Sequence, residues 1–159
     1  MLKILFVCHG NICRSPMAQG IFDSILLNHS LNHQIMCDSA GTSNKHVGEE
    51  PDSRTLQTLS NHSITLSHKA RQFKATDFEI YDYIVAMDLF NQAHVLHQKY
   101  KILSPKSQIT LIRKFDHLAE NLSVPDPYIW DIEKFEEVYE ILDRSLRNFL
   151  EAIKQEYIL

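Results

Sequence analysis

A cysteine and an arginine near the start of the chain, Cys8 and Arg14, have the types and spacing that phosphate chemistry needs. Five residues separate them in the run Val-Cys-His-Gly-Asn-Ile-Cys-Arg-Ser-Pro, which covers residues 7–16. In a loop between a strand and a helix, successive backbone N–H groups and the positive helix end form a binding site for a dianion. The planar guanidinium of Arg14 can hold two phosphate oxygens. The N–H groups also stabilise a thiolate at Cys8, and a thiolate is a strong nucleophile.

The other loop residues are expected to shape this site. Gly10 is predicted to take backbone angles that other residues resist, Ser15 to donate a hydrogen bond to the Cys8 sulfur, and Asn11 to brace the loop through its amide. The remaining residues expected to contact phosphate or substrate are His9, Ile12 and Cys13. Alone, a free cysteine is usually a small buried hydrophobe. The flanking strand and helix signals favour the functional interpretation.

The elements on either side of the loop follow from local patterns. The apolar run Lys3–Val7 predicts a buried strand, and Ser15 as N-cap with Pro16 at the first helical position predicts a helix. Further strands are expected over 35–40, 83–87 and 109–112, and helices near 51–59, over 88–98 and after Asp131.

This alternation predicts an α/β fold: a three-layer sandwich whose four-stranded parallel sheet carries helices on both faces and an N-terminal phosphate-binding loop. With no internal repeat or linker, residues 1–159 are expected to form a single domain.

Further motifs occur in a fixed order along the chain. They are Ser39-Ala40-Gly41-Thr42-Ser43, Val47-Gly48, Pro51-Asp52, residues 67–72, Met87-Asp88 with Asn91, and Asp126-Pro127-Tyr128. Together with residues 7–18 they resemble the low-molecular-weight protein tyrosine phosphatase family over nearly the whole chain. The resemblance implies hydrolysis of protein phosphotyrosine to tyrosine and phosphate through a cysteinyl-phosphate intermediate, with no metal or other cofactor. It implies catalytic roles for Cys8 and Arg14, and support of the loop by Ser39 and His68.

The resemblance also assigns a proton donor. A departing tyrosine oxygen needs a proton, which Asp126 is expected to supply before acting as base for the hydrolytic water. Two prolines in Val124-Pro125-Asp126-Pro127-Tyr128 stiffen this segment. Without the phosphate loop, an Asp-Pro surface turn would be the preferred interpretation.

The predicted pocket wall departs from the family pattern. Tyr128 is expected to stack on the substrate ring, but Ile129 replaces the frequent second aromatic residue. Lys45 stands where the family usually has Trp or Tyr. The family's protein-arginine phosphatases carry Thr at the position of Ile12, and an apolar Ile12 favours contact with a phenyl ring.

The remaining thiols and imidazoles have two interpretations each. Cys13 is the expected redox partner of Cys8, since in this family such a pair forms a reversible disulfide; the alternative is an inert buried thiol. Cys37 is expected to pack on its strand. The helical pairs His94/His97 and His29/His33 lack a third ligand at metal spacing, so solvated helix faces are favoured over a metal site.

Three rival functions were weighed. An arsenate reductase on the same fold would need relay cysteines near residues 80–90, where this chain has none. A phosphate-binding module without catalysis would be consistent only with the Lys45 departure. A structural adaptor would need an exposed apolar patch, which sequence does not reveal.

Net charge, the length of the first apolar run and the cysteine count restrict the possible partners and cellular location. A net charge of -4 gives no global attraction to nucleic acid. The first apolar run, 1–7, is too short for a signal peptide or a membrane span. Three cysteines in such a chain indicate a reducing compartment. A cytoplasmic monomer acting on phosphotyrosine-containing proteins is therefore expected, with no membrane insertion.

Overall fold

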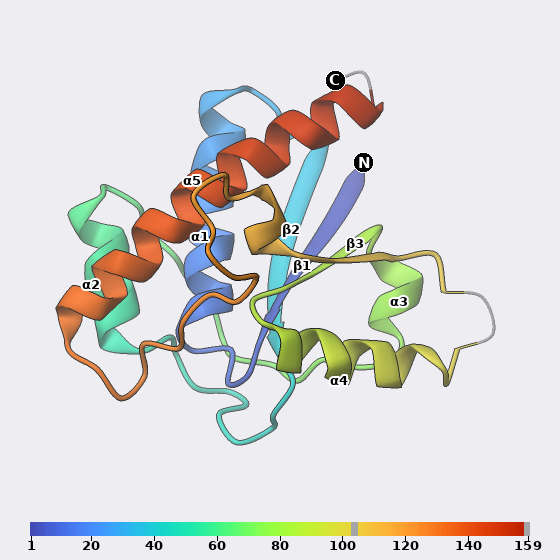
Figure 1. The fold of residues 1–159 in the computed structure, drawn as a ribbon, viewed down its shortest axis with the longest axis horizontal. Coiled ribbons are helices and arrows are strands. Elements are labelled where there is room, and N and C mark those ends of the chain that lie inside the picture. The colour runs from blue at the N-terminus through green and yellow to red at the C-terminus, as the bar shows by residue number, and fades with distance from the viewer. Residues whose placement is uncertain (103–104, 158–159) are drawn as a thin grey trace.

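Four parallel strands form the central sheet of the computed structural model, which describes residues 1–102 and 105–157. In spatial order they are β2 (Ile35–Gly41), β1 (Leu2–Cys8), β3 (Tyr83–Ala86) and β4 (Gln108–Leu111) (Figure 1). Val7 lies opposite Ala40 on one side and Ala86 on the other. The predicted α/β class and parallel sheet are confirmed, with strand ends shifted by at most one residue.

Helices cover both faces of this sheet, as predicted. On one face lie α1 (Arg14–Asn28), α2 (Ser53–Asn61) and the long α5 (Ile132–Tyr157); on the other lie α3 (Asp77–Ile80) and α4 (Leu89–Lys99) (Figure 1). The short α3 and the 3-10 helix η1 (Ile112–Phe115) were not predicted. Each is a single turn, too short to show a hydrophobic period.

Alternation along β1 divides the core in two. Ile4 and Phe6 belong to the apolar cluster that contains α1 and α5, whereas Leu5 and Val7 belong to the cluster beneath α4. Successive side chains of a strand point to opposite faces, and both faces are covered here. The continuous apolar run that predicted this strand is therefore what a central parallel strand requires.

The start of α1 differs from the prediction. The helix begins at Arg14 with Cys13 in the N-cap position and no side-chain capping bond, so Ser15 is not the N-cap. The Ser15 hydroxyl lies 3.0 Å from the Cys8 sulfur instead. Pro16 becomes the third helical residue, where a backbone N–H has no intrahelical acceptor, so the proline costs no hydrogen bond.

The sheet order places the phosphate loop at a topological switch point. The chain leaves β1 through α1 toward β2 on one side, while β3 and β4 lie on the other side of β1. In open α/β sheets, ligands bind at the carboxyl ends of the strands where the order reverses. The loops after β1 and β3 meet there, and the backbone N–H of Val124 donates to the carbonyl of Met87 at 2.8 Å.

A buried carboxylate, Asp116, joins η1 to α5. Its side chain is fully buried and accepts hydrogen bonds from Arg144 Nε at 2.7 Å and Nη2 at 3.0 Å, with Arg113 at 3.3 Å. Asp116→Asn leaves these guanidinium groups without their counter-charge, so urea unfolding is expected to show a loss of about 3 kcal/mol. The control is Asp143→Asn, which removes an exposed pair with Arg147 and is expected to cost below about 1 kcal/mol. Equal losses would contradict this role.

The same pair gives a pH dependence. Hydrogen bonding from Arg144 holds the pKa of Asp116 below its usual value. The unfolded chain, with an aspartate pKa of about 3.9, then binds more protons than the folded chain in acid. The stabilisation is present above about pH 4 and is lost as pH falls through the folded-state pKa. The difference in free energy of unfolding between wild type and Asp116→Asn should therefore become smaller in acid.

Candidate active site

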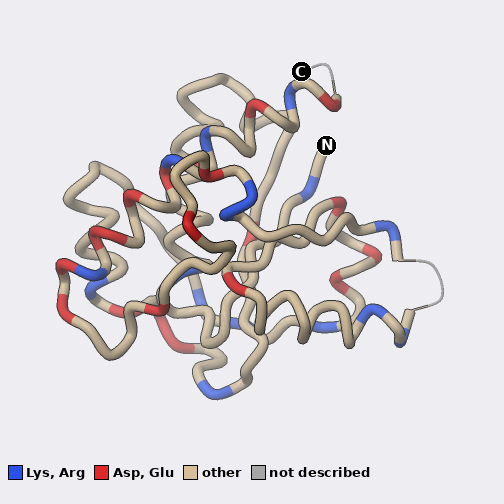
Figure 2. Tube along the Cα trace, viewed as in Figure 1, with Lys and Arg blue, Asp and Glu red and all other residues tan. Residues whose placement is uncertain are grey.

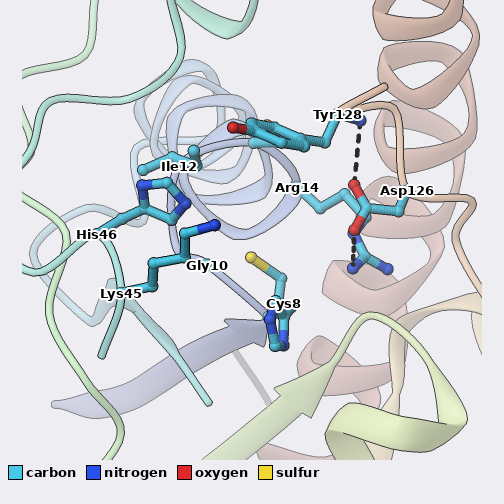
Figure 3. A pocket seen from close by; sticks show the side chains of 10 residues that line it. Cys8, Gly10, Ile12, Arg14, Lys45, His46, Asp126 and Tyr128 are labelled. Carbon is cyan, nitrogen blue, oxygen red and sulfur yellow. Dashed lines mark hydrogen bonds and ion pairs between the residues drawn. The ribbon is translucent and has the colours of Figure 1, made fainter. Parts of the chain in front are cut away.

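The sulfur of Cys8 lies at the last position of β1, where it accepts hydrogen bonds from the loop that follows. The backbone N–H of Asn11 donates to it at 3.3 Å, and the Ser15 hydroxyl lies 3.0 Å away. Cys8 is 2% exposed, with its sulfur directed into a pocket (Figure 3). Hydrogen-bond donors aimed at a sulfur favour the thiolate, which is the reactive form.

Asn11, rather than Gly10, supplies the unusual backbone conformation of the loop. Its φ of 56° is in the left-handed region, which Asn tolerates better than most residues. Gly10 does not take a positive φ, so the predicted reason for this glycine is wrong. A Cβ at Gly10 would lie 3.2 Å from the His46 ring, so lack of a side chain provides space there.

The side chain of Asn11 is fully buried and hydrogen-bonded to four residues. Its Nδ2 donates to the hydroxyls of Ser15 and Ser39, both at 2.9 Å. Its Oδ1 accepts from His68 Nε2 and from the backbone N–H of Arg71, again at 2.9 Å. The predicted support residues Ser39 and His68 thus lie behind the loop, outside the pocket. Burial lowers the pKa of His68, which favours the neutral ring.

The end of β2 packs tightly against the start of the loop. The N–H groups of Thr42 and Ser43 donate to the carbonyls of Cys8 and His9, both at 2.9 Å. A Cβ at Gly41 would lie 2.7 Å from the His9 carbonyl oxygen, closer than real Cβ contacts come. Only glycine permits this approach.

The guanidinium of Arg14 is buried, at 3% exposure, and held by two carboxylates. Its Nη1 donates to Asp88 at 2.7 Å and to the Val124 carbonyl at 3.0 Å, and its Nη2 donates to Asp126 at 3.1 Å. Burial lowers the pKa of Arg14, but the charges of Cys8, Asp126 and Asp88 raise it more. Among the described residues, three of its five N–H donors are engaged, which leaves two for phosphate oxygens.

Asp88 was not predicted as a site residue. Its Oδ1 caps α4 by accepting from the Asn91 N–H at 2.7 Å, while its Oδ2 faces Arg14. One carboxylate thus fixes both a helix start and the Arg14 guanidinium. The Met87-Asp88 motif carried the signal, because it follows the strand next to β1.

Asp126 lies at the pocket rim, 50% exposed, with both oxygens fixed. Oδ2 accepts from Arg14, and Oδ1 accepts from the Tyr128 N–H at 3.1 Å (Figure 3). Arg54 holds the same loop from α2: it donates to the Tyr128 carbonyl at 3.0 Å and pairs with Asp52 at 2.7 Å. The loop position is therefore set by α2 as well as by the prolines.

The pocket has a volume of about 240 Å³ and brings together most of the predicted residues (Figure 3). Those that line it are Cys8, His9, Gly10, Ile12, Cys13, Arg14, Lys45, Asp126 and Tyr128. Lys45 points its ammonium group into the pocket. His46 was missed: its ring lies 6.2 Å from that of Tyr128, tilted by 58°. The imidazole of His46 thus forms part of the pocket wall beside Lys45.

The three cysteines are free thiols, and two have raised pKa values. Burial, followed by the charges of Asp52 and Cys8, raises the pKa of Cys13. Burial and the neighbouring Asp23 raise the pKa of Cys37. The Cys37 thiol donates to the Asp23 carboxylate of α1 at 3.1 Å, outside the pocket. Both thiols are thereby kept protonated.

Within residues 1–102 and 105–157, the part of the chain that the structure describes, no group of three or more His, Cys, Asp or Glu side chains is arranged to hold a metal ion. No helix within it has both the length and the apolar character needed to cross a membrane.

Comparisons with known proteins agree with this geometry. The family described as "Low molecular weight phosphotyrosine protein phosphatase" matches residues 3–158. The pig protein of that name is 35% identical over 152 residues, covering 96% of each chain. A protein tyrosine phosphatase from Entamoeba histolytica has a similar structure, with a TM-score of 0.92, 33% identity, and coverage of 98% of this chain and 99% of the other.

A Drosophila arginine phosphatase is equally similar in structure, with a TM-score of 0.92, 35% identity, and coverage of 96% of this chain and 98% of its own. The family match extends over nearly every residue, and its identities and coverage far exceed what a shared fold alone requires. The chain belongs to the low molecular weight phosphotyrosine protein phosphatase family.

Proposed function

We propose that this protein hydrolyses phosphotyrosine in proteins through a cysteinyl-phosphate intermediate. The observation that carries the proposal is the meeting of a nucleophile, a phosphate ligand and an acid around one pocket. The Cys8 sulfur accepts a hydrogen bond from the Asn11 N–H and lies 3.0 Å from the Ser15 hydroxyl, and Arg14 contacts Asp126 at 3.1 Å. These three residues come from positions as far apart as 8 and 126.

In the first step the Cys8 thiolate attacks phosphorus and the bond from phosphorus to the tyrosine oxygen breaks. Arg14 and the loop N–H groups hold the equatorial oxygens and offset the charge that spreads over them. Asp126 gives its proton to the tyrosine oxygen, so the leaving group departs as a neutral phenol. The products are free tyrosine on the protein and phosphate bonded to sulfur.

In the second step water attacks the cysteinyl phosphate. The Asp126 carboxylate takes a proton from that water, the phosphorus–sulfur bond breaks, and inorganic phosphate leaves. The electron pair returns to Cys8 as a thiolate. Ser15, 3.0 Å from the sulfur, donates a hydrogen bond that stabilises it as a leaving group.

The ion pair between Arg14 and Asp126 is exchanged when substrate binds. A phosphate dianion offers Arg14 a stronger partner than a half-exposed carboxylate. It also puts negative charge beside Asp126, and a neighbouring negative charge favours the protonated acid that the first step requires. The carboxylate thus turns from ligand of Arg14 to proton donor.

Tyrosine is favoured over arginine as the phosphorylated residue. Ile12 lines the pocket and is 7% exposed, so it presents an apolar surface to the group above the phosphate. A phenyl ring matches that surface and can also stack on Tyr128, whereas a guanidinium would lose hydration without a hydrogen-bond partner at Ile12.

The experiment that tests the proposal is steady-state hydrolysis of phosphotyrosine, phosphoserine and phosphoarginine under reducing conditions. Turnover of phosphotyrosine with little turnover of the other two would support it. A higher kcat/KM for phosphoarginine would overturn the substrate assignment. Failure on all three, with phosphate still bound, would make the protein a phosphate-binding module.

Lys45→Trp is expected to lower the Michaelis constant for phosphotyrosine peptides by roughly threefold to tenfold, with kcat little changed. Lys45 lines the pocket, and an indole there can stack on the substrate ring. Lys45→Ala is the control, because it removes the charge without adding a ring. An unchanged Michaelis constant in Lys45→Trp would mean that residue 45 does not contact bound substrate.

The partners and setting follow from the same observations. We propose phosphotyrosine-containing proteins as partners, a single domain over 1–159, a monomer, and a reducing cytoplasmic setting that keeps the three thiols free. Basic residues are interspersed with acidic ones along the described chain (Figure 2), and the net charge is -4, so we expect no general attraction to nucleic acid. We also propose Cys13 as the thiol that pairs with an oxidised Cys8, since both line one pocket.

A further inference from the structure

Two consecutive apolar residues at the start of α4 are exposed beside the catalytic pocket. Leu89 is 55% exposed and Phe90 is 87% exposed. They directly follow Asp88, the carboxylate that holds Arg14. Single exposed apolar side chains are ordinary, but this position places an aromatic ring next to a reaction centre.

Phe90 borders a second hollow, of about 430 Å³, adjoining the catalytic pocket. Its outer wall includes Phe90, Ser123 and Pro125. The two hollows share His9, Arg14 and Asp126. The two hollows therefore lie side by side, with Asp126 in the wall that they share.

When a phosphotyrosine of a protein occupies the catalytic pocket, the residues next to it in that protein lie near the second hollow. Its phosphate is held by Arg14 and its ring by Ile12 and Tyr128, so the peptide backbone leaves the pocket at the rim where Asp126 lies. A chain crossing Asp126 enters the second hollow. This step rests on the function proposed above, because only a peptide substrate has such neighbours.

The chemistry of the hollow favours an apolar occupant. Both of its carboxylates have other roles: Asp88 pairs with Arg14 at 2.7 Å, and Asp126, which pairs with Arg14 at 3.1 Å before substrate binds, is the protonated acid of the first step once substrate is bound. They therefore offer little to a cationic side chain. Phe90 and Pro125 instead expose apolar surface that a bulky side chain would remove from water.

We propose that this hollow binds a bulky apolar side chain within two residues of the phosphotyrosine, and that Phe90 is the residue that selects it. The site would make the enzyme prefer such peptides over those with small or charged neighbours. Phe90 acts on substrate binding and takes no part in bond breaking.

The test uses phosphotyrosine peptides whose four nearest neighbours are alanine, and variants with Leu, Phe, Asp or Lys at one of these positions. Wild type is expected to show kcat/KM roughly tenfold higher for Leu or Phe at one position or more than for alanine. Phe90→Ala should reduce that ratio to near one, and Phe90→Leu should keep part of it. Tyr100→Ala is the matched control, because Tyr100 is 91% exposed at the other end of α4 and should leave the ratio unchanged.

Each other outcome overturns a distinct statement. Equal rates on all peptides would overturn the apolar subsite and leave the phosphatase assignment intact. A preference that survives in Phe90→Ala, or a preference for Asp or Lys, would overturn the role of Phe90. No hydrolysis of any peptide would overturn the proposed function itself. A wild-type dimer that Phe90→Ala dissociates in sedimentation would mean that a second copy covers this surface.

Discussion

Cys8→Ser is expected to abolish turnover of phosphotyrosine, with a loss of roughly 10⁴-fold or more in kcat. A serine hydroxyl at this position can accept the same hydrogen bonds from Asn11 and Ser15. It remains protonated at neutral pH, however, and an alcohol is a far weaker nucleophile than a thiolate. The readout is single-turnover hydrolysis of a phosphotyrosine peptide, with phosphoenzyme trapped by acid quench.

The variant should still bind phosphate, because Arg14 and the loop N–H groups are unchanged. Titration calorimetry with inorganic phosphate distinguishes a folded variant that has lost only its nucleophile from an unfolded one. Cys37→Ser is the matched control: it makes the same atomic change at a buried thiol bonded to Asp23, outside the pocket. Substantial turnover by Cys8→Ser would eliminate the covalent mechanism. Equal losses in the two variants would point to unfolding instead.

The part of the site that could be predicted from sequence is the part whose residues are neighbours along the chain. Residues 8–15 act as a unit because one strand, one loop and one helix start hold them, so local patterns sufficed to propose Cys8 as the nucleophile and Arg14 as the phosphate ligand. Asp126 lies 112 positions from Arg14, and no local pattern connects them. Its proposed role came from resemblance to a family.

Local reasoning failed where distant groups competed for the same atoms. Ser15 has the features of an N-cap, but the Cys8 sulfur engages its hydroxyl. Gly10 is the residue whose type allows unusual angles, but Asn11 takes them, because its amide is bonded to Ser39, His68 and Arg71. Those partners come from segments that sequence alone does not place around the loop.

The direction of side chains in irregular segments was the other feature that the sequence did not predict. Residues 42–52 contain no regular element, so no period says which side chain faces the pocket. Lys45 was considered because the family has an aromatic residue there, and His46 was overlooked although its ring lies beside Tyr128. Asp88 was overlooked as well, since it was treated only as the first residue of the expected helix over 88–98, whereas it is the N-cap of α4.

Asp126→Ala is expected to slow hydrolysis of phosphotyrosine by roughly 10²- to 10⁴-fold, the range that a positioned general acid contributes. The loss should depend on the leaving group. Nitrophenolate is a stable anion that departs with little protonation. The factor by which Asp126→Ala lowers kcat should therefore be at least about tenfold smaller for nitrophenyl phosphate than for phosphotyrosine. The measurement is kcat for both substrates, and for a series of aryl phosphates spanning the acidity between them.

Removal of Asp126 also frees Arg14 Nη2, so a loss could arise from a displaced guanidinium rather than from a missing proton. Asp126→Asn separates the two effects: its single amide oxygen can replace Oδ2 and still accept from Arg14, while its NH2 group takes the place of Oδ1 and gives up the bond from the Tyr128 N–H. The amide cannot protonate a phenolate. If Asp126 is the acid, Asn and Ala should lose similar rates, with similar dependence on the leaving group. If its role is to orient Arg14, Asn should restore most of the activity, and both variants should slow phosphotyrosine and the nitrophenyl ester equally.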